Sequence, residues 1–222
     1  MHVTKKNPPM PVEELIRTGK AFHERNWIMG AAGNFSAVLS RRPFEWVITK
    51  SGVHKESLTS SDFVYLDRDG RSRDPARPPA AETPIHSAII SDAGAGAVLQ
   101  THSVWSTVLA DTYSESGGIE LEGFDVLKSL SPVKNGYPLE WVPILERSEN
   151  YPALAETIAR LLKRRPDTHA ILLRKHGLYT WGSTVQEATR HIEVFELLFE
   201  VLVRKLHIFS QADASRASRP CS

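Results

Sequence analysis

Apolar and polar positions follow two different periods along this chain, and segments of the two kinds alternate throughout it. Short runs rich in β-branched and aromatic residues predict strands at 34–39, 46–49, 63–66, 97–101, 141–145, 169–173 and 178–181. Apolar residues spaced three and four apart predict a helix that opens at Pro11 and is broken at Gly30, and others at 82–92, 104–110, 121–130, 151–163 and 185–206. This alternation predicts a single α/β domain with a central mixed β-sheet flanked by helices.

The last helix has the clearest periodicity. Its apolar positions are Val185, Ala188, Ile192, Phe195, Phe199, Leu202 and Leu206. Such a stripe packs a helix on its own sheet, and supporting subunit contacts is the alternative. The Pro-rich residues 1–10 predict a loose arm, and 208–222 lack periodicity and predict a disordered tail. We therefore expect the folded domain at 11–207.

Composition narrows the function classes. The 222 residues carry 27 Lys and Arg against 26 Asp and Glu, so we expect no nucleic-acid partner that needs a dominant basic field. The single cysteine, Cys221, excludes an internal disulfide framework and a Cys-rich zinc site. No apolar run approaches the roughly 20 residues that span a bilayer, and the N-terminus lacks the apolar core of a signal peptide. We expect a cytoplasmic protein with no membrane partner.

Two segments place histidines where they could bind a metal. In AVLQTHS, Gln100 and His102 are two apart on a predicted strand, so both side chains point to one face. In RKHG, His176 precedes Gly177 at the end of an apolar run. Neutral imidazole is a common zinc ligand. Taken alone, each histidine is as well explained by an ordinary hydrogen bond at a strand end or in a turn.

Acidic residues offer candidates for proton transfer. Glu82 opens a predicted helix, and His86 lies one turn later on the same face. Glu82 could cap the helix, act as an acid or base, or accompany a metal. Glu122 and Asp125 are three apart and would share a face of the predicted 121–130 helix, where a solvated acidic surface is the alternative.

Two glycine-bearing turns, GAAGNFS at 30–36 and TKSG at 49–52, could bind a phosphate through backbone N–H groups. The candidate substrate-binding residues in them are Gly33, Asn34, Lys50, Ser51 and Gly52. Neither turn matches a Walker A or dinucleotide-binding fingerprint, so each alone could be an ordinary turn.

Taken in chain order, these segments resemble the class II (zinc-dependent) aldolase and adducin family, from about residue 12 to residue 206. The segments that carry the resemblance are GAAGNFS, ITKSGVHKESL, AAETPIHSAII, AVLQTHSVWSTVLA, EGFDVLKSL and LLRKHGLYTWG. The resemblance implies a mixed sheet flanked by helices and a homotetramer with active sites between subunits. Within the family, THS and RKHGLYTWG most favour the branch that dehydrates a sugar phosphate.

The resemblance also implies one Zn²⁺ per subunit, held by two histidines of an H-x-H strand motif and a third in an H-G turn. His102 and His176 match two of these ligands, but Gln100 stands where the family has the first histidine. An amide oxygen is a weaker zinc ligand than imidazole. Gln100 therefore either ligates through its carbonyl, gives way to another ligand or water, loosens the metal or impairs the site.

The remaining roles are likewise implied by the resemblance. Glu82 matches the family's catalytic carboxylate, and Asp125, with Glu122 as the alternative, matches an acid that transfers protons in the dehydratases. Gly33, Asn34, Ser51 and Gly52 match phosphate-binding positions, with Lys50 as a nearby cation, while Ala80 and Ala81 replace two phosphate-binding serines.

The activity implied by this branch is dehydration of 5-methylthioribulose 1-phosphate to 2,3-diketo-5-methylthiopentyl 1-phosphate, a step of methionine salvage. Two alternatives stay open. One is an aldolase or epimerase that acts on another sugar phosphate with the same zinc. The other is a metal-impaired, non-catalytic scaffold, which the glutamine at position 100 favours.

Overall fold

An eight-stranded mixed sheet runs through the protein in the order β3-β2-β1-β4-β8-β7-β6-β5. The computed structural model describes residues 9–130 and 138–217, with side chains described as far as Ile208. The strands are β1 (Phe35–Arg41), β2 (Phe44–Thr49), β3 (Phe63–Leu66), β4 (Ala97–Thr101), β5 (Gly118–Glu122), β6 (Leu139–Leu145), β7 (Ala170–Leu173) and β8 (Gly177–Gly182). Neighbouring strands are antiparallel except β6 and β7, which are parallel, so the sheet is mixed as predicted.

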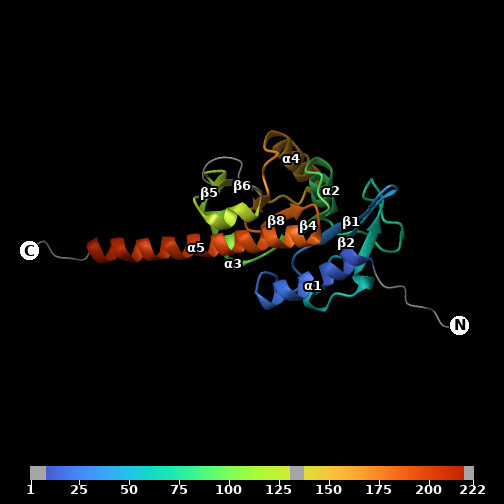
Figure 1. Ribbon diagram of the computed structural model, residues 1–222, viewed down its shortest axis with the longest axis horizontal. Helices are drawn as coiled ribbons and strands as arrows, with labels where there is room; N and C mark the ends of the chain where they lie inside the picture. The colour runs from blue at the N-terminus through green and yellow to red at the C-terminus, as the bar shows by residue number, and fades with distance from the viewer. Residues whose placement is uncertain (1–8, 131–137, 218–222) are drawn as a thin grey trace, which may run out of the picture.

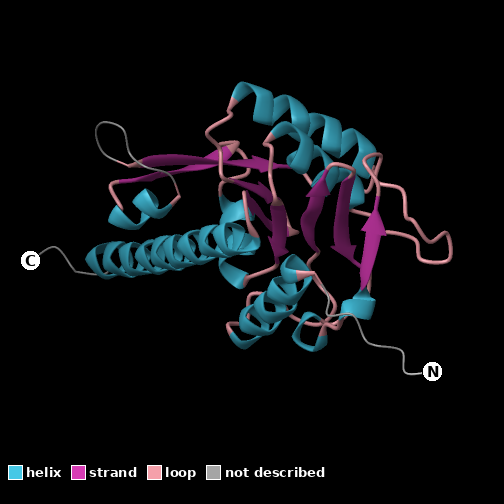
Figure 2. Ribbon diagram, turned by 45° about the vertical axis from the view of Figure 1, so that its right-hand side comes forward, coloured by secondary structure: helices cyan, strands magenta, loops and turns pink. Residues whose placement is uncertain are grey.

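Helices cover both faces of this sheet (Figures 1 and 2). The α-helices are α1 (Met10–Glu24), α2 (Thr83–Asp92), α3 (Val104–Thr112), α4 (Tyr151–Arg164) and α5 (Val185–Ala217). Short 3₁₀ helices are η1 (Lys55–Ser57), η2 (Ser60–Asp62) and η3 (Asp125–Ser129). Figure 1 shows α2 and α4 together on one side of the sheet, with α1, α3 and α5 on the other.

The sheet separates two hydrophobic cores. One contains residues of α1, α3 and α5, such as Leu15 and Phe195, and the other contains residues of α2 and α4, such as Ile89 and Ile158. On the central strand β4, Leu99 packs into the first core and its neighbour Val98 into the second. Successive strand residues point to opposite faces, so a strand buried on both faces is apolar without alternation. This explains the continuous apolar run that marks β4 in the sequence.

Most predicted elements are confirmed, but the predicted helix at 121–130 is wrong. Leu121 and Glu122 end strand β5, and only Asp125–Ser129 forms a single 3₁₀ helix. Gly123, with φ of +78°, separates the two in a conformation that favours glycine. Along β5, Ile119 and Leu121 are buried and alternate with exposed Glu120, a period-two signal that the sequence analysis missed.

The ends of the domain also differ from expectation. Helix α5 continues to Ala217, so the predicted disordered tail is wrong for 208–217 (Figure 1). Neither glycine nor proline occurs between Val185 and Ala217, so nothing in the sequence breaks the helix once it has started. At the other end, α1 already includes Met10, while residues 1–8 of the predicted arm and 218–222 of the predicted tail lie outside the described residues.

Among the described helices, none combines the length and apolarity needed to cross a membrane.

Candidate active site

Strand direction brings the predicted site residues to one end of the sheet. Strand β1 starts where its antiparallel neighbours β2 and β4 end, and β8 starts where β4 ends. The residues just outside these strand ends therefore meet there. They are Asn34 before β1, Ser51 after β2, His102 after β4 and His176 before β8. Glu82, at the start of α2, joins them because the Asn34 side-chain amide donates to its Oε2.

A pocket of about 270 Å³ opens at this end of the sheet. Its lining residues are Ala31, Ala32, Gly33, Asn34, Ser51, Gly52, Ala81, Glu82, His102, Tyr151 and His176. Most of the residues singled out in the sequence therefore share one cavity. Lys50, the cation expected beside the phosphate turns, does not line it.

Glu82 is a buried carboxylate held by specific partners. Its Oε1 lies 2.9 Å from Nε2 of His176. Burial acts to raise the pKa of the Glu82 carboxyl, but His176 and the Asn34 amide, with further help from His86, hold that pKa below its ordinary value. Glu82 occupies the N-cap position of α2, yet its side chain makes no capping hydrogen bond. The helix-capping interpretation is thus excluded, and Glu82 presents an ionised base to the pocket.

The amide of Gln100 has a defined orientation. Its Oε1 accepts the Asn34 backbone N–H at 3.0 Å, which leaves Nε2 directed at the two histidines. That nitrogen lies 2.8 Å from Nε2 of His176 and 3.4 Å from Nε2 of His102. An amide nitrogen donates hydrogen bonds and has no lone pair for a metal. In this orientation the amide nitrogen of Gln100, and not its oxygen, faces the two imidazoles.

The two imidazoles fit a metal. Their rings lie with centroids 4.7 Å apart, and both Nε2 atoms face the same region beside the Glu82 carboxylate. Burial lowers the pKa of His102 to about 4, so this imidazole is neutral, as a metal ligand must be. No three His, Cys, Asp or Glu side chains within residues 9–130 and 138–208 form a complete metal centre. The site thus contains two of the three imidazoles that the resemblance implies.

The structure does not bring the predicted acids Glu122 and Asp125 to the pocket. The Asp125 side chain is 90% exposed and pairs with Lys128, whose hydrogen bond lowers the pKa of the Asp125 carboxyl. Glu122 is exposed at the end of β5. Because β5 and η3 replace the predicted helix, these two acids share no helical face, and neither lines the pocket.

Three site residues were missed in the sequence. Tyr151 lines the pocket from the first turn of α4, and the Tyr179 hydroxyl lies 3.5 Å from Nε2 of His176. Lys55 is buried behind the pocket, where its ammonium donates to the carbonyl oxygens of Ala31 and Val53. Lys55 belongs to the segment ITKSGVHKESL, but no local pattern distinguishes a buried lysine from a solvated one.

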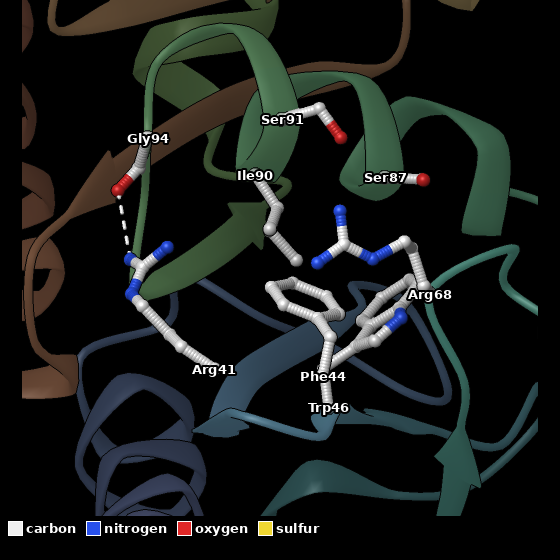
Figure 3. A pocket seen from close by; sticks show the side chains of 8 residues that line it. All are labelled: Arg41, Phe44, Trp46, Arg68, Ser87, Ile90, Ser91 and Gly94. Atoms are coloured by element: carbon white, nitrogen blue, oxygen red, sulfur yellow. Dashed lines mark hydrogen bonds between the residues drawn. The ribbon is translucent and has the colours of Figure 1, made fainter.

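A second hollow, of about 330 Å³, lies where β1 ends and β2 begins, beside α2 (Figure 3). The Arg68 guanidinium lies over the Phe44 ring at 5.3 Å, and Arg41 donates to the carbonyl oxygen of Gly94. The residues that line this hollow include no histidine or carboxylate and none of the predicted site residues. This hollow therefore offers no acid–base group like those that line the pocket containing Glu82.

Comparison with known proteins agrees with this geometry. The methylthioribulose-1-phosphate dehydratase of Methylococcus capsulatus (strain ATCC 33009 / NCIMB 11132 / Bath) is 38% identical over 192 residues, which cover 86% of this chain and 92% of the relative. The enzyme of the same name from Marinobacter nauticus (strain ATCC 700491 / DSM 11845 / VT8) is 34% identical over 197 residues, covering 88% and 94%.

The fold has close counterparts among solved structures. The L-fuculose-1-phosphate aldolase from Thermus thermophilus superposes with a TM-score of 0.69 at 24% identity, covering 95% of this chain and 98% of that one. Residues 13–203 match the family described as the class II aldolase and adducin N-terminal domain. The chain belongs to the class II aldolase and adducin family.

Proposed function

We propose that this protein is a lyase that removes water from 5-methylthioribulose 1-phosphate, giving 2,3-diketo-5-methylthiopentyl 1-phosphate, in methionine salvage. The observation that carries the proposal is the buried, ionised Glu82, 2.9 Å from His176 in a pocket flanked by two glycine turns. Curated relatives named for this dehydratase activity support it, at 31–38% identity over most of the chain.

The glycine turns are suited to the phosphate. Gly33 and Gly52 have φ of +81° and +73°, a region that favours glycine. The backbone N–H groups of Gly33, Ser51 and Gly52 donate to no acceptor in the described part of the chain, and all three residues line the pocket. Free N–H groups in successive turns form an anion-binding concavity. A phosphate bound there would place the carbonyl end of the sugar toward Glu82.

Glu82 is the base in this proposal. Its low pKa makes it a carboxylate at neutral pH, able to take the proton from C3, next to the C2 carbonyl. The Asn34 side-chain amide donates to Oε2 of Glu82 and holds the carboxylate in one orientation. Loss of the C4 hydroxyl needs an acid. Asp125 is exposed to solvent on a single chain and does not reach its own pocket, so we propose that the acid comes from a neighbouring subunit.

We further propose one Zn²⁺ per subunit, held by His102 and His176. When bound, the metal would act as a Lewis acid that stabilises negative charge on the substrate's carbonyl oxygen. The neutral imidazole of His102 and the convergence of the two Nε2 atoms support this assignment. The low cysteine content is compatible with a cytoplasmic location, which we also propose.

A homotetramer is the assembly that we propose. Apolar side chains on the outer surfaces of α3 and α5 are left exposed on a single chain, among them Val104 at 66% and Leu197 at 50%. Exposed apolar residues on packed neighbouring helices are suited to subunit contacts. Sedimentation velocity should give a species near four times 24.8 kDa, and a monomer would contradict the proposal.

The test is turnover of 5-methylthioribulose 1-phosphate by zinc-reconstituted protein, with the diketone followed directly. We expect product, and we expect a chelator to abolish it. Glu82→Gln should lower kcat by about 10²–10⁴-fold because the base is lost, whereas Glu156→Gln, at an exposed carboxylate on α4, should not.

Other outcomes would identify a different function. Bound zinc without dehydration would favour an aldolase or epimerase acting on another sugar phosphate. Neither zinc nor product would favour the scaffold alternative, in which Gln100 has replaced a ligand that the chemistry needs.

A further inference from the structure

Lys55 is the one lysine or arginine that is buried within the described parts of the chain, with 1% of its surface exposed. Its backbone packs against Gly19 of α1, where any side chain at position 19 would collide with the Lys55 carbonyl oxygen. Its ammonium donates to the carbonyl oxygen of Val53 at 2.7 Å and to that of Ala31 at 3.3 Å. The fold thus buries this cation behind Ala31, a residue that lines the active-site pocket.

This buried cation has no carboxylate partner within salt-bridge distance among the described residues. Burying an ammonium without a counter-ion is costly. Burial lowers the pKa of Lys55 to about 8, although the negative charges of Glu82 and Glu56 oppose the shift. The ammonium is therefore still mostly charged at neutral pH, and an anion that entered the pocket would supply the missing negative charge.

The two carbonyl groups that bind Lys55 belong to the two glycine turns. Ala31 precedes Gly33 in the first turn, and Val53 follows Gly52 in the second. The Lys55 ammonium therefore ties together two segments whose free N–H groups line the pocket. The first turn precedes β1 and the second follows its antiparallel partner β2, so the two turns lie side by side and the Lys55 ammonium contacts both.

We propose that Lys55 is the positioning cation of the phosphate site: it holds the two glycine turns at a fixed separation and supplies positive charge beneath them, so that the pocket takes a phosphate monoester dianion. The inference rests on the proposed sugar-phosphate function and goes beyond it by naming the residue that prepares the anion site. Neither Lys50, the cation that the sequence analysis favoured, nor Lys55 lines the pocket, but the Lys55 ammonium binds carbonyl groups of both turns.

The first experiment measures binding of inorganic phosphate to metal-free protein by calorimetry, so that no metal contributes. Lys55→Met keeps most of the length of the unbranched side chain and removes the charged amine. We expect it to weaken phosphate binding by about tenfold or more, as expected for loss of a charged hydrogen-bonding group. The matched control Lys20→Met, at an exposed lysine of α1, should leave binding unchanged. An affinity of Lys55→Met within twofold of the wild type would overturn the proposal.

A second measurement can be made on the wild type alone, so its main result does not depend on whether the variant folds. Sulfate keeps its charge throughout the neutral and alkaline range, so its binding to the metal-free wild type reports on the protein alone. Of the charged and titratable groups that act on Lys55, Glu82 and Glu56 have pKa values below the ordinary range and His102 one of about 4. Among these groups, only Lys55 itself changes charge between pH 7 and pH 9.5.

We therefore expect sulfate affinity to fall as the pH rises through about 8, and to be flat in Lys55→Met. A wild-type affinity that does not change across this range would contradict the proposal. The two hypotheses fail separately. Normal turnover with unchanged anion binding in Lys55→Met would remove the role of Lys55 alone. If the wild type has no turnover but Lys55→Met still weakens anion binding, the dehydratase proposal fails and the anion site stands.

Discussion

At position 100 a single amide group determines which atom faces the two imidazoles. Gln100 is fully buried, and the Asn34 backbone N–H fixes its oxygen, so the amide nitrogen must face His102 and His176. To ligate a metal through its oxygen, Gln100 would have to turn its amide over and leave the half-buried Asn34 N–H without this acceptor, at a cost of about 1 kcal/mol. We therefore expect this chain to hold zinc more weakly than a three-histidine site would.

This expectation gives a prediction at the residue scale. Gln100→His should slow the loss of zinc to a chelator, because an imidazole replaces an amide that donates hydrogen bonds. His176→Ala should abolish tight binding, since it removes one of the two imidazoles. The measurement is metal content after timed dialysis against a chelator. Equal retention in Gln100→His and wild type would show that position 100 does not reach the metal, and normal zinc in His176→Ala would refute the site.

Between elements, the close approach of β4 and the turn before β8 determines where the histidines lie. Gly177 has φ of +148°, and a Cβ there would overlap the carbonyl oxygen of Thr101. The residues next to these two positions are His176 and His102. Only a glycine allows the two strand ends to come this close, so the glycine in the H-G turn is what permits the two imidazoles to share one pocket.

Gly177→Ala should therefore lower the free energy of unfolding by at least ~3 kcal/mol, because it combines an unfavourable φ with a backbone collision. Gly30→Ala is the matched control. Its φ is +59° and a Cβ there meets nothing within 4 Å, so its cost should be only ~1–2 kcal/mol. Urea unfolding of the two variants gives the comparison, and equal costs would disprove the argument from the collision.

In the whole molecule, stability depends on pH through buried groups outside the pocket. Burial raises the pKa of Glu196 on α5 to about 7, even though the Thr101 hydroxyl donates a hydrogen bond to its Oε1. A raised carboxyl pKa contributes stability below the ordinary value of 4.5, and this contribution is lost as the pH rises through about 7. His86 and His191 act in the opposite sense, because burial lowers the pKa of each to about 4, and they destabilise the fold as the pH falls from 6.5 toward 4.

Glu196→Gln tests the first of these effects. The amide keeps an oxygen for the Thr101 hydroxyl and cannot ionise, so the variant should gain up to about 3 kcal/mol over the wild type at pH 8. At pH 5 the two proteins should differ little. The measurement is the free energy of unfolding at both pH values, with Glu120→Gln, an exposed carboxylate on β5, as the control. A gain that is the same at both pH values would point to packing and not to ionisation.

The elements that could be predicted from the sequence are those set by interactions between residues close together in the chain. Strands such as β3 and β4 and the central part of α5 were predicted from local periodicity, because residues within a few positions of one another determine that signal. Strand β5 was missed because its last two residues, Leu121 and Glu122, were included in the predicted helix at 121–130. The C-terminal part of α5 was missed because the sequence analysis relied on apolar spacing.

The sequence by itself determined which chemical groups are available: Glu82, two histidines and two glycine turns, each placed at the end of a predicted element. Only the tertiary structure decided how these groups act. The antiparallel register of β1, β2, β4 and β8 brings them to one edge of the sheet. Contacts between distant segments orient the Gln100 amide, bury Lys55 and leave Asp125 exposed. Burial and hydrogen-bond direction arise from such long-range contacts, and for this reason no local pattern in the sequence contains them.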